Sequence, residues 1–271
     1  MDKRSRVGFE EPGCPHARNT FDLRRPRWLP VPVDAQGVMV DGLPALDYLF
    51  ATPSQQSPTT VTLSLARRQQ LLKRSSADDF VVIEDDYEAE NLVEGVPMPA
   101  LKSMDRSGRV IYVGSLSKCL SPAVRLGYIV APRALAAELR LLRHAMVRHP
   151  SAFLQHAYAL FLSLGHHESH ARRVNQAMQE RLALTAQALR RHLPDCHFSL
   201  SVGGASIWVQ TLAWLDSADL APAARRHGAL LEPGHVYFAT RPSPCPYFPL
   251  RLSSIAPDKI DAGVRAGRCD G

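Results

Sequence analysis

The chain has 271 residues, of which 45% are hydrophobic and 21% are charged. This is an ordinary globular composition with enough chain for a sizeable core. No apolar run reaches the ~18 residues of a membrane span, and Met1–Arg6 lacks the apolar stretch of a secretory signal. The five cysteines are scattered, which argues against a disulfide framework and a zinc site. We therefore expect a cytoplasmic protein with no membrane partner and no bound metal.

The formal charge of +6 is spread along the chain, without a zinc-finger, RNP or basic-zipper pattern. A moderately basic surface is the simpler interpretation, and it also suits a protein that holds an anionic cofactor. His166 and His170 have the spacing of one helix face, but no further ligand has a suggestive spacing, so a metal role is not predicted.

The first 132 residues alternate short apolar runs with helical or turn-rich stretches. Several runs are continuous and rich in Val, Ile and Tyr, which is typical of strands covered on both faces of a parallel sheet. A helix over Leu63–Ser75 lies between two of them, giving an α/β pattern. The predicted strands are Val7–Glu10, Trp28–Pro32, Tyr48–Thr52, Phe80–Asp85, Val110–Leu116 and Leu126–Ala131.

After Pro132 the pattern becomes helical and then mixed, as in a compact α+β unit. The division predicted from this change is a large domain over 1–150 and a small C-terminal domain over 151–271. The predicted helices are Arg133–Val147, Phe153–Leu164, Ser169–Leu193 and Ser217–His227. The predicted strands are Phe198–Val202, Ser206–Gln210, Val236–Ala239 and Pro249–Ser253.

One candidate site follows the strand that begins at Val110, where the sequence reads Gly-Ser-Leu-Ser-Lys up to Lys118. Open α/β sheets bind ligands at the carboxyl ends of their strands. A desolvated lysine there can form a Schiff base with an aldehyde. Ser115 and Ser117 offer hydroxyls for a phosphate, and Arg125 can clamp one bidentately. Taken alone, a solvated loop lysine is the commoner case.

A second candidate site ends the strand over Phe80–Asp85. Asp85 and Tyr87 share one side of an extended segment, and Asp86 points the other way, toward a helix amino terminus or solvent. A carboxylate beside a phenol meets the needs of a pyridine ring, whose nitrogen it keeps protonated. A solvated acidic turn is the alternative. Near the end, Arg251 in an apolar strand suits recognition of a carboxylate, with a snorkelling edge arginine as its alternative.

These signals come in the order and spacing of fold-type I pyridoxal phosphate (PLP) enzymes, and they most resemble the aminotransferase-like, class I/II domain of MocR/GabR-type proteins. The resemblance covers nearly the whole chain. It implies an α/β large domain with a mostly parallel, three-layer sheet and a smaller α+β domain. The stretches that carry it are EEPGCPHAR, VPVDAQGVMVDGLP, TPSQQSPTT, SLARRQQLL, VVIEDDYEAE, PALKSMDRSGRVIYVGSLSKCLSPAVRLGYIVAP and LRLSS.

The resemblance also implies roles. Lys118 looks like the Schiff-base lysine, which forms an aldimine with PLP and shuttles the α-proton of the ligand. Asp85 resembles the pyridine-nitrogen partner and Tyr87 the phenol at the ring oxygen. The other residues that the resemblance implicates are Ser115, Ser117 and Arg125 at the phosphate, Gln56 near the cofactor oxygen and Arg251 at the substrate carboxylate.

Departures from the family pattern set expectations of their own. Cys14 stands where an aromatic residue stacks on the pyridine ring, and Thr60 replaces a glycine. The family's winged-helix domain and the first segment of its large domain are not in this sequence, so we expect an open sheet edge beside Leu126–Ala131 and weakened cofactor binding.

Three functions follow from the resemblance. The first is a transaminase-like protein acting on an amino acid or amine. The second is the ligand-sensing module of a MocR-type regulator, without direct DNA binding by this chain. The third is an inactive truncated remnant. The resemblance also implies a homodimer.

Overall fold

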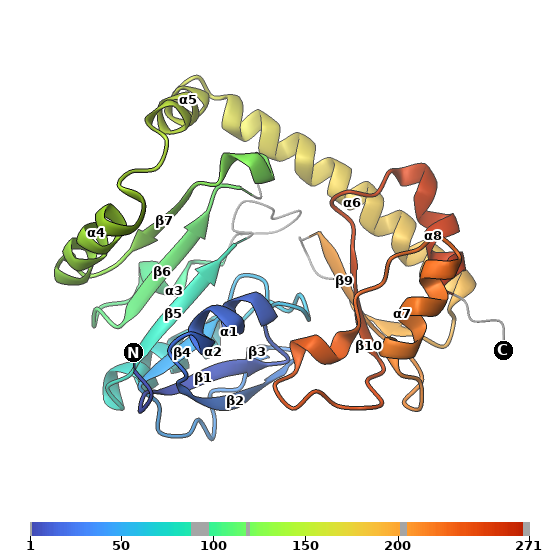
Figure 1. The fold of residues 1–271 in the computed structure, drawn as a ribbon, viewed down its shortest axis with the longest axis horizontal. Coiled ribbons are helices and arrows are strands. Elements are labelled where there is room, and N and C mark those ends of the chain that lie inside the picture. The colour runs from blue at the N-terminus through green and yellow to red at the C-terminus, as the bar shows by residue number, and fades with distance from the viewer. Residues whose placement is uncertain (1, 88–97, 118–119, 201–204, 268–271) are drawn as a thin grey trace.

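In a computed structural model of the protein, the described residues are 2–87, 98–117, 120–200 and 205–267. They form a large sheet with flanking helices and a smaller sheet packed against a long helix (Figure 1). Within these ranges no helix combines the length and hydropathy that crossing a bilayer requires.

The large sheet has the strand order β3-β2-β1-β4-β5-β6-β7. The strands β2, β1, β4, β5 and β6 run parallel, and the edge strands β3 and β7 pair antiparallel with their neighbours. This confirms the predicted, mostly parallel α/β sheet. The bounds are β1 (Arg6–Glu11), β2 (Arg27–Asp34), β3 (Gly37–Val38), β4 (Tyr48–Ala51), β5 (Val81–Asp86), β6 (Val110–Ser115) and β7 (Gly127–Val130).

The small sheet is antiparallel with the order β10-β9-β8, formed by β8 (His197–Phe198), β9 (Ser206–Gln210) and β10 (Tyr247–Arg251). The predicted strand over Val236–Ala239 is wrong, because most of this segment belongs to the 3-10 helix η2 (Gly234–Tyr237). Its Val-Tyr-Phe content favours a strand, but Pro233 precedes it and Gly234 begins it. A β-carbon on Gly234 would collide with the Tyr247 backbone, so the turn requires glycine.

The five predicted helices appear within a few residues as α2, α4, α5, α6 and α7, and α1, α3 and α8 were not predicted. Their bounds are α1 (Pro15–Asp22), α2 (Leu65–Ala77), α3 (Leu101–Met104), α4 (Arg133–Val147), α5 (Ala152–Ser163), α6 (His166–His192), α7 (Ser217–Arg226) and α8 (Ile260–Ala266), with 3-10 turns η1 (Pro122–Val124) and η3 (Pro257–Lys259). Helix α6 runs from α5 into the small sheet, where its last turns pack beside α8 (Figure 1). The predicted domain boundary at residue 150 falls between α4 and α5 and stays a prediction.

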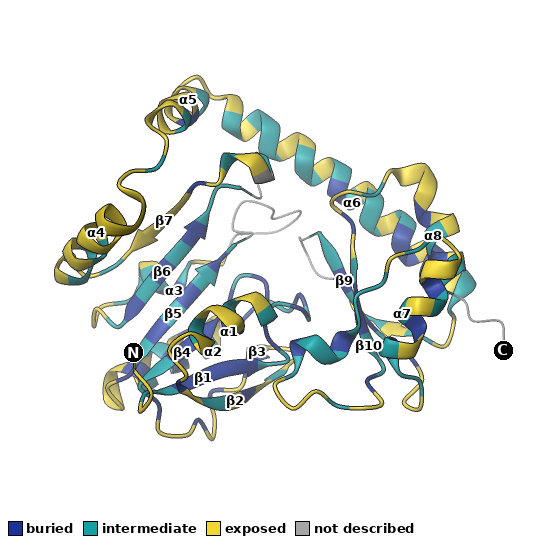
Figure 2. Cartoon of the chain, in the orientation of Figure 1, coloured by how far each residue is buried: buried dark blue, intermediate teal, exposed yellow. Residues whose placement is uncertain are grey.

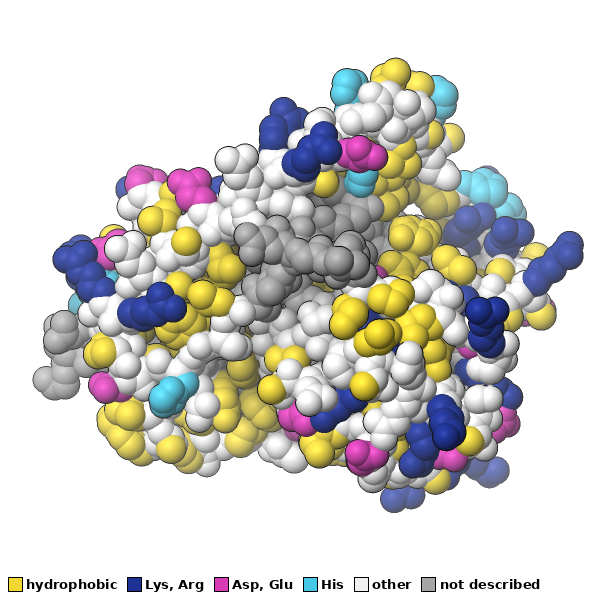
Figure 3. All heavy atoms as spheres, turned by 180° about the vertical axis from the view of Figure 1, so that it is seen from behind, with side chains coloured by type: hydrophobic (Ala, Val, Ile, Leu, Met, Phe, Trp, Pro, Cys, Tyr) yellow, Lys and Arg dark blue, Asp and Glu magenta, His cyan; other side chains and the backbone are white. Residues whose placement is uncertain are grey.

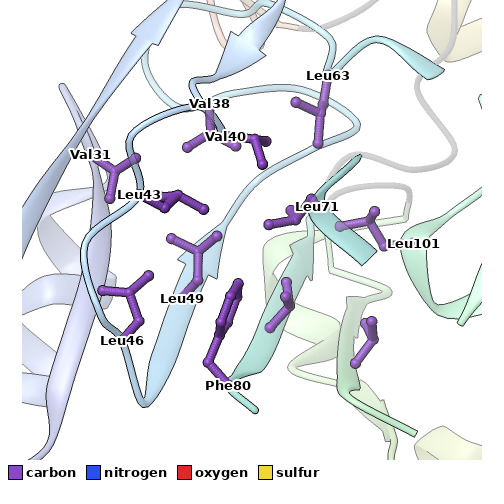
Figure 4. Packing of buried hydrophobic residues seen from close by; sticks show 12 residues of the cluster. Val31, Val38, Val40, Leu43, Leu46, Leu49, Leu63, Leu71, Phe80 and Leu101 are labelled. Atoms are coloured by element: carbon purple, nitrogen blue, oxygen red, sulfur yellow. The ribbon is translucent and has the colours of Figure 1, made fainter. Parts of the chain in front are cut away.

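Two apolar cores hold these layers together. One lies beneath the large sheet, where strand residues such as Leu49 and Val82 meet Leu71 of α2 and Leu101 of α3 (Figure 4). The other lies between the small sheet, α6 and α8, and includes Leu189, Val209 and Ile260. Burial of apolar side chains on this scale is the main source of stability in such layers.

The expected open edge is present at β7. Among the described residues β7 pairs only with β6, and its four residues are exposed. Helix α4, which follows it, has no buried residue, and Leu141 and Met146 are 68% and 72% exposed (Figure 2). Seen from behind, apolar side chains also share the surface with histidines where α5 meets α6 (Figure 3). Large exposed apolar surface of this kind marks contact sites.

Three hydrogen bonds tie the segment after β1 to η2. The Gly13 N–H donates to the Tyr237 carbonyl oxygen at 2.9 Å. The Arg18 guanidinium donates to the Val236 carbonyl oxygen at 2.7 Å, and the Ala239 N–H donates to the Glu11 carboxylate at 2.8 Å. These bonds fix the small sheet relative to the carboxyl ends of the large sheet.

Candidate functional site

The end of β5 bears three carboxylates, of which Glu84 and Asp86 are buried on one side of the strand and Asp85 lies on the other. Glu84 is fully buried and accepts from the backbone N–H groups of Leu101 and Lys102 at the start of α3, at 2.7 and 2.8 Å. Asp86 is also buried and accepts from the Tyr112 hydroxyl at 3.0 Å. The prediction that Asp86 points to a helix terminus or to solvent is therefore wrong; Glu84 holds the helix terminus instead.

Asp85 lies on the other side of β5 and is only partly exposed. Among the residues that the structure describes, its carboxylate has no hydrogen-bond or ion-pair partner. Burial, together with the nearby charge of Asp86, raises the pKa of Asp85 to about 6. Burying a carboxylate without such a partner is costly, so Asp85 favours a ligand that brings a cation or a hydrogen-bond donor.

Tyr87 follows on the same side as Asp85 and lines a small pocket with residues of the small sheet. This pocket lies between the predicted pyridine-ring residues and Arg251. The residues that line it are Ser57, Pro58, Tyr87, Ala205, Ser206, Tyr237, Pro249, Arg251 and Ser253.

The structure brings Ser115, Ser117 and Arg125 to one end of β6 and β7. Ser115 pairs with Gly127, and the Leu116 N–H donates to the Leu126 carbonyl oxygen at 3.0 Å. The Ser117 N–H donates to the Ser115 hydroxyl at 3.4 Å. Arg125 is exposed, and no partner for its guanidinium is found within the described ranges. These hydroxyls and this cation form a set that suits a phosphate.

The backbone of Arg125 has φ 49°, in the left-handed region. Residues other than glycine rarely adopt this backbone conformation, and backbone strain of this kind is commonest at binding sites. Lys118 lies outside the described residues, as does Cys119. The role of Lys118 therefore stays a prediction.

Gln56, predicted near the cofactor oxygen, forms hydrogen bonds to both β1 and its own loop. Its side chain is 1% exposed. Its amide nitrogen donates to Glu10, at 3.1 Å, and to the carbonyl oxygens of Pro12 and Ser57. Its amide oxygen accepts from both Thr59 donors. These hydrogen bonds join the loop after β4 to the end of β1, so Gln56 positions the loop, and direct contact with a cofactor stays a prediction.

Glu10, at the end of β1, is 2% exposed, and the sequence analysis did not assign it a role. Its carboxylate accepts from the Thr52 hydroxyl at 2.6 Å, from the Thr52 N–H and from Gln56. Burial outweighs these bonds and raises its pKa to about 7, with a contribution from the charge of Asp85. In the sequence, only its place as the first residue of the Glu-Glu-Pro-Gly motif could have drawn attention to Glu10.

Cys14, predicted to replace a stacking aromatic residue, lies in the candidate site at the start of α1 and is half-buried. Burial raises the pKa of its thiol, on which the charges of Asp85 and Arg251 also act. A thiol offers no ring for stacking, so this contact would be weaker than in the family pattern.

Arg251, on β10, belongs to a group that the sequence did not predict. Its Nη2 donates to the Glu232 carboxylate at 2.9 Å and to the Tyr237 hydroxyl at 2.7 Å. Tyr237 in turn donates to the same Glu232 oxygen at 2.7 Å. Glu232 and Tyr237 lie in segments whose pattern predicts only irregular structure and a strand, so no motif marks them. The structure thus joins the predicted Arg251 to Glu232, from the loop before η2, and to Tyr237, the last residue of η2.

A parallel sheet bears Asp85, Tyr87, Ser115, Ser117 and Arg125 at its carboxyl end, and a small domain presents Arg251 opposite them. This arrangement defines the class of fold-type I PLP-dependent proteins. Asp85 and Arg125 have no side-chain partner within the described parts of the chain; the Asp85 carboxylate fits a protonated ring nitrogen, and the Arg125 guanidinium fits a phosphate. Among the described residues no group of three or more His, Cys, Asp or Glu side chains is arranged for a metal ion.

Comparison with known proteins gives the family. The model of the family "Aminotransferase class I and II" matches residues 15–261, and the chain belongs to this family, whose members depend on PLP. The transcriptional regulator TauR of Rhodobacter capsulatus is 39% identical over 96% of this chain and 54% of its own. Aromatic-amino-acid aminotransferase 1 of Thermococcus litoralis is 26% identical over 87% of this chain and 59% of its own. The chain thus spans about half the length of the curated relatives it matches.

Solved structures agree on the fold. The kynurenine aminotransferase of Pyrococcus horikoshii, solved with PMP, superposes with a TM-score of 0.94 at 26% identity, covering 99% of this chain and 69% of that one. The α-aminoadipate aminotransferase LysN of Thermus thermophilus, solved with a phosphopyridoxyl-leucine, has a TM-score of 0.90 at 26% identity and covers 98% of this chain and 71% of that one. Both likenesses confirm the predicted fold-type I architecture.

Proposed function

We propose that the chain holds PLP between its two sheets and binds an amino acid or amine there. The observation that carries this proposal is the partly buried carboxylate of Asp85, which has no hydrogen-bond or ion-pair partner among the described residues and is followed by Tyr87, in a pocket that Arg251 also lines. When bound, PLP supplies an electron sink that makes the α-carbon of a bound amine acidic. Lys118 would anchor it, and Ser115, Ser117 and Arg125 would hold its phosphate.

The residues of this chain have distinct parts in the proposed site. Asp85 keeps a proton on the ring nitrogen, because its carboxylate regains a charged partner only while that nitrogen is protonated. The Tyr87 hydroxyl donates a hydrogen bond to the ring oxygen. Arg251 orients the carboxylate of the ligand, and Lys118 moves the α-proton as base and then as acid.

Reconstitution with PLP tests this proposal. The purified chain is mixed with PLP, freed of excess by gel filtration, and its visible absorption is recorded. We expect a protein-bound cofactor band that is absent from Lys118→Ala and retained by the control Lys102→Ala, whose side chain contacts Asp105 and Val110 in the large sheet. A wild-type chain that elutes without the band would refute the proposal and favour an inactive remnant.

Ligand sensing is a second candidate function, and the relatives favour it. TauR is an HTH-type transcriptional regulator. MocR of Rhizobium meliloti, a probable rhizopine catabolism regulatory protein, is 36% identical over 69% of this chain and 38% of its own. Addition of amino acids to the PLP-loaded chain separates the two functions. Release of a keto acid supports transamination, and a spectral change without keto acid supports sensing.

We further propose a cytoplasmic homodimer. The exposed apolar residues of β7 and α4 support self-association, because surface of this kind is rarely left open to water. The cytoplasmic location rests on the likeness to transcriptional regulators. Sedimentation velocity of the purified chain tests the dimer.

A further inference from the structure

The side chain of Glu232 occupies the anion-binding side of Arg251. The Glu232 Oε2 accepts from Arg251 Nη2 at 2.9 Å and from the Tyr237 hydroxyl at 2.7 Å. The same Nη2 donates to the Tyr237 hydroxyl at 2.7 Å. An amino group of guanidinium carries two hydrogens, and these two acceptors account for both of them.

This engagement limits how Arg251 can bind a second anion. A carboxylate that binds a guanidinium bidentately uses two parallel N–H groups, and both accessible edges of the fork include Nη2. Among the described residues the Nε and Nη1 of Arg251 have no hydrogen-bond partner, but neither edge is complete without Nη2. A bidentate ligand must therefore displace Glu232 or Tyr237.

The charges act in the same direction. Burial opposes ionisation of Glu232, but the hydrogen bonds from Tyr237 and Arg251 outweigh it and lower the pKa of Glu232. Burial opposes the charge of Arg251 as well, but its hydrogen bonds and charge interactions with Glu232 and Tyr237 outweigh burial and raise the pKa of Arg251. The two charges cancel at neutral pH. A ligand carboxylate at Arg251 would lie beside the negative Glu232 unless that side chain turns away.

We propose that Glu232 is a specificity-determining residue that competes with ligand carboxylates for Arg251, so that the site disfavours carboxylate ligands relative to primary amines that lack a carboxylate. This inference rests on the proposed function, which assigns Arg251 to the ligand. Glu232 lies opposite the cofactor residues, on the loop before η2, and Tyr237 holds both side chains in line. Tyr237 packs edge-on against Trp208, at 5.4 Å between ring centroids, which keeps its hydroxyl in place.

Chemical labelling of Arg251 measures this competition without the cofactor. Phenylglyoxal modifies arginine, and peptide mapping by mass spectrometry follows Arg251, which is 55% exposed in its side chain. Sodium propionate is the probe, and the concentration that halves the labelling rate reports its affinity. We expect Glu232→Gln to lower this concentration, because propionate then no longer competes with a carboxylate for Arg251. The factor should be about fivefold and no larger, because the pair is partly exposed and its charge attraction is modest.

Controls make the result specific. Glu168→Gln removes the same charge from an exposed residue of α6 and should leave the propionate concentration unchanged. Propylamine, which has no carboxylate, should protect Arg251 in none of the variants. Tyr237→Phe frees one Nη2 hydrogen while keeping the aromatic ring, and should lower the concentration by a smaller factor. If circular dichroism shows that Glu232→Gln is unfolded, Tyr237→Phe still tests the inference.

Equal propionate concentrations in wild type and both variants would overturn the inference, as would failure of propionate to protect Arg251 in every protein. The PLP band of the loaded chain is read separately. If that band is absent while Glu232→Gln shifts the propionate concentration, the proposed function fails and the competition stands. If the band is present without any shift, only the competition fails.

Discussion

The amide nitrogen of Gln56 donates a hydrogen bond to the Glu10 carboxylate at 3.1 Å, deep beneath the candidate site. Both side chains are almost completely buried. The loop after β4 therefore rests on a single carboxylate at the end of β1, and the ionisation of this carboxylate affects the whole site.

Stability should fall as the pH rises toward neutrality because of Glu10. Its pKa is raised from 4.5 to about 7, so the folded chain binds a proton that the unfolded chain has already lost. The stabilisation is full below pH 4.5, is lost as the pH rises to about 7, and amounts to about 3 kcal/mol. Urea unfolding from pH 4.5 to 8 should show a shallower decline in Glu10→Gln. An unchanged slope would contradict the assigned pKa, and Glu168→Gln serves as control.

Gly13 should not tolerate a side chain. A β-carbon there would collide with the Glu10 carbonyl oxygen and the Phe9 ring, and its N–H ties β1 to η2. We expect Gly13→Ala to lower the free energy of unfolding by about 1–3 kcal/mol. Gly263→Ala in α8 is the matched control, since its β-carbon meets nothing closer than 3.8 Å and alanine favours a helix. Equal thermal midpoints for the two variants would disprove the collision.

Much of the fold could be predicted from the sequence because its signals are local. The run FVVIEDD and the strand after Arg109 are continuous apolar segments, and both appear within a residue or so as β5 and β6. The segment Val236–Ala239 misled because its residues favour strands, whereas Pro233 and Gly234 impose a turn. The two-residue strand β3 is too short to leave a pattern.

The candidate site was only partly predictable. Asp85 and Tyr87 follow from alternation along one strand, which is a local rule. The links from Arg251 to Glu232 and from Gln56 to Glu10 join segments distant in sequence, and no spacing rule reaches them. The direction of Asp86 depends on Tyr112 of the neighbouring strand, which only the register of β5 and β6 determines.

Arg125 should show opposite effects on stability and binding. Glycine adopts φ 49° without strain, so Arg125→Gly should raise the free energy of unfolding by up to about 1 kcal/mol. Loss of the guanidinium should weaken PLP binding at least about tenfold, because charged hydrogen bonds to phosphate are lost. Arg25→Gly has the same φ at the other end of the strands and should change stability alone. Fluorescence titration with PLP measures the affinity; equal affinities would remove Arg125 from the phosphate site.

The apolar surface of α4 should drive self-association. The double variant Leu141→Gln with Met146→Gln replaces side chains that are mostly exposed, so the cost in stability should stay within about 0.5 kcal/mol. The sedimentation coefficient should fall to that of a monomer. Leu23→Gln, at a residue 83% exposed outside α4, should leave the coefficient as in wild type. An unchanged coefficient in the double variant would place the dimer contact elsewhere.

The hydrogen bond from Arg18 to Val236 joins residues 218 positions apart. During synthesis the ribosome releases β1 and α1 long before it translates η2, Tyr237 or Arg251. The large sheet can pair early from its consecutive strands, but the part of its carboxyl edge that the small sheet covers is completed only after η2 and β10 have been synthesised. A nascent chain that ends before η2 would thus carry a folded large sheet without the residues that close its pocket.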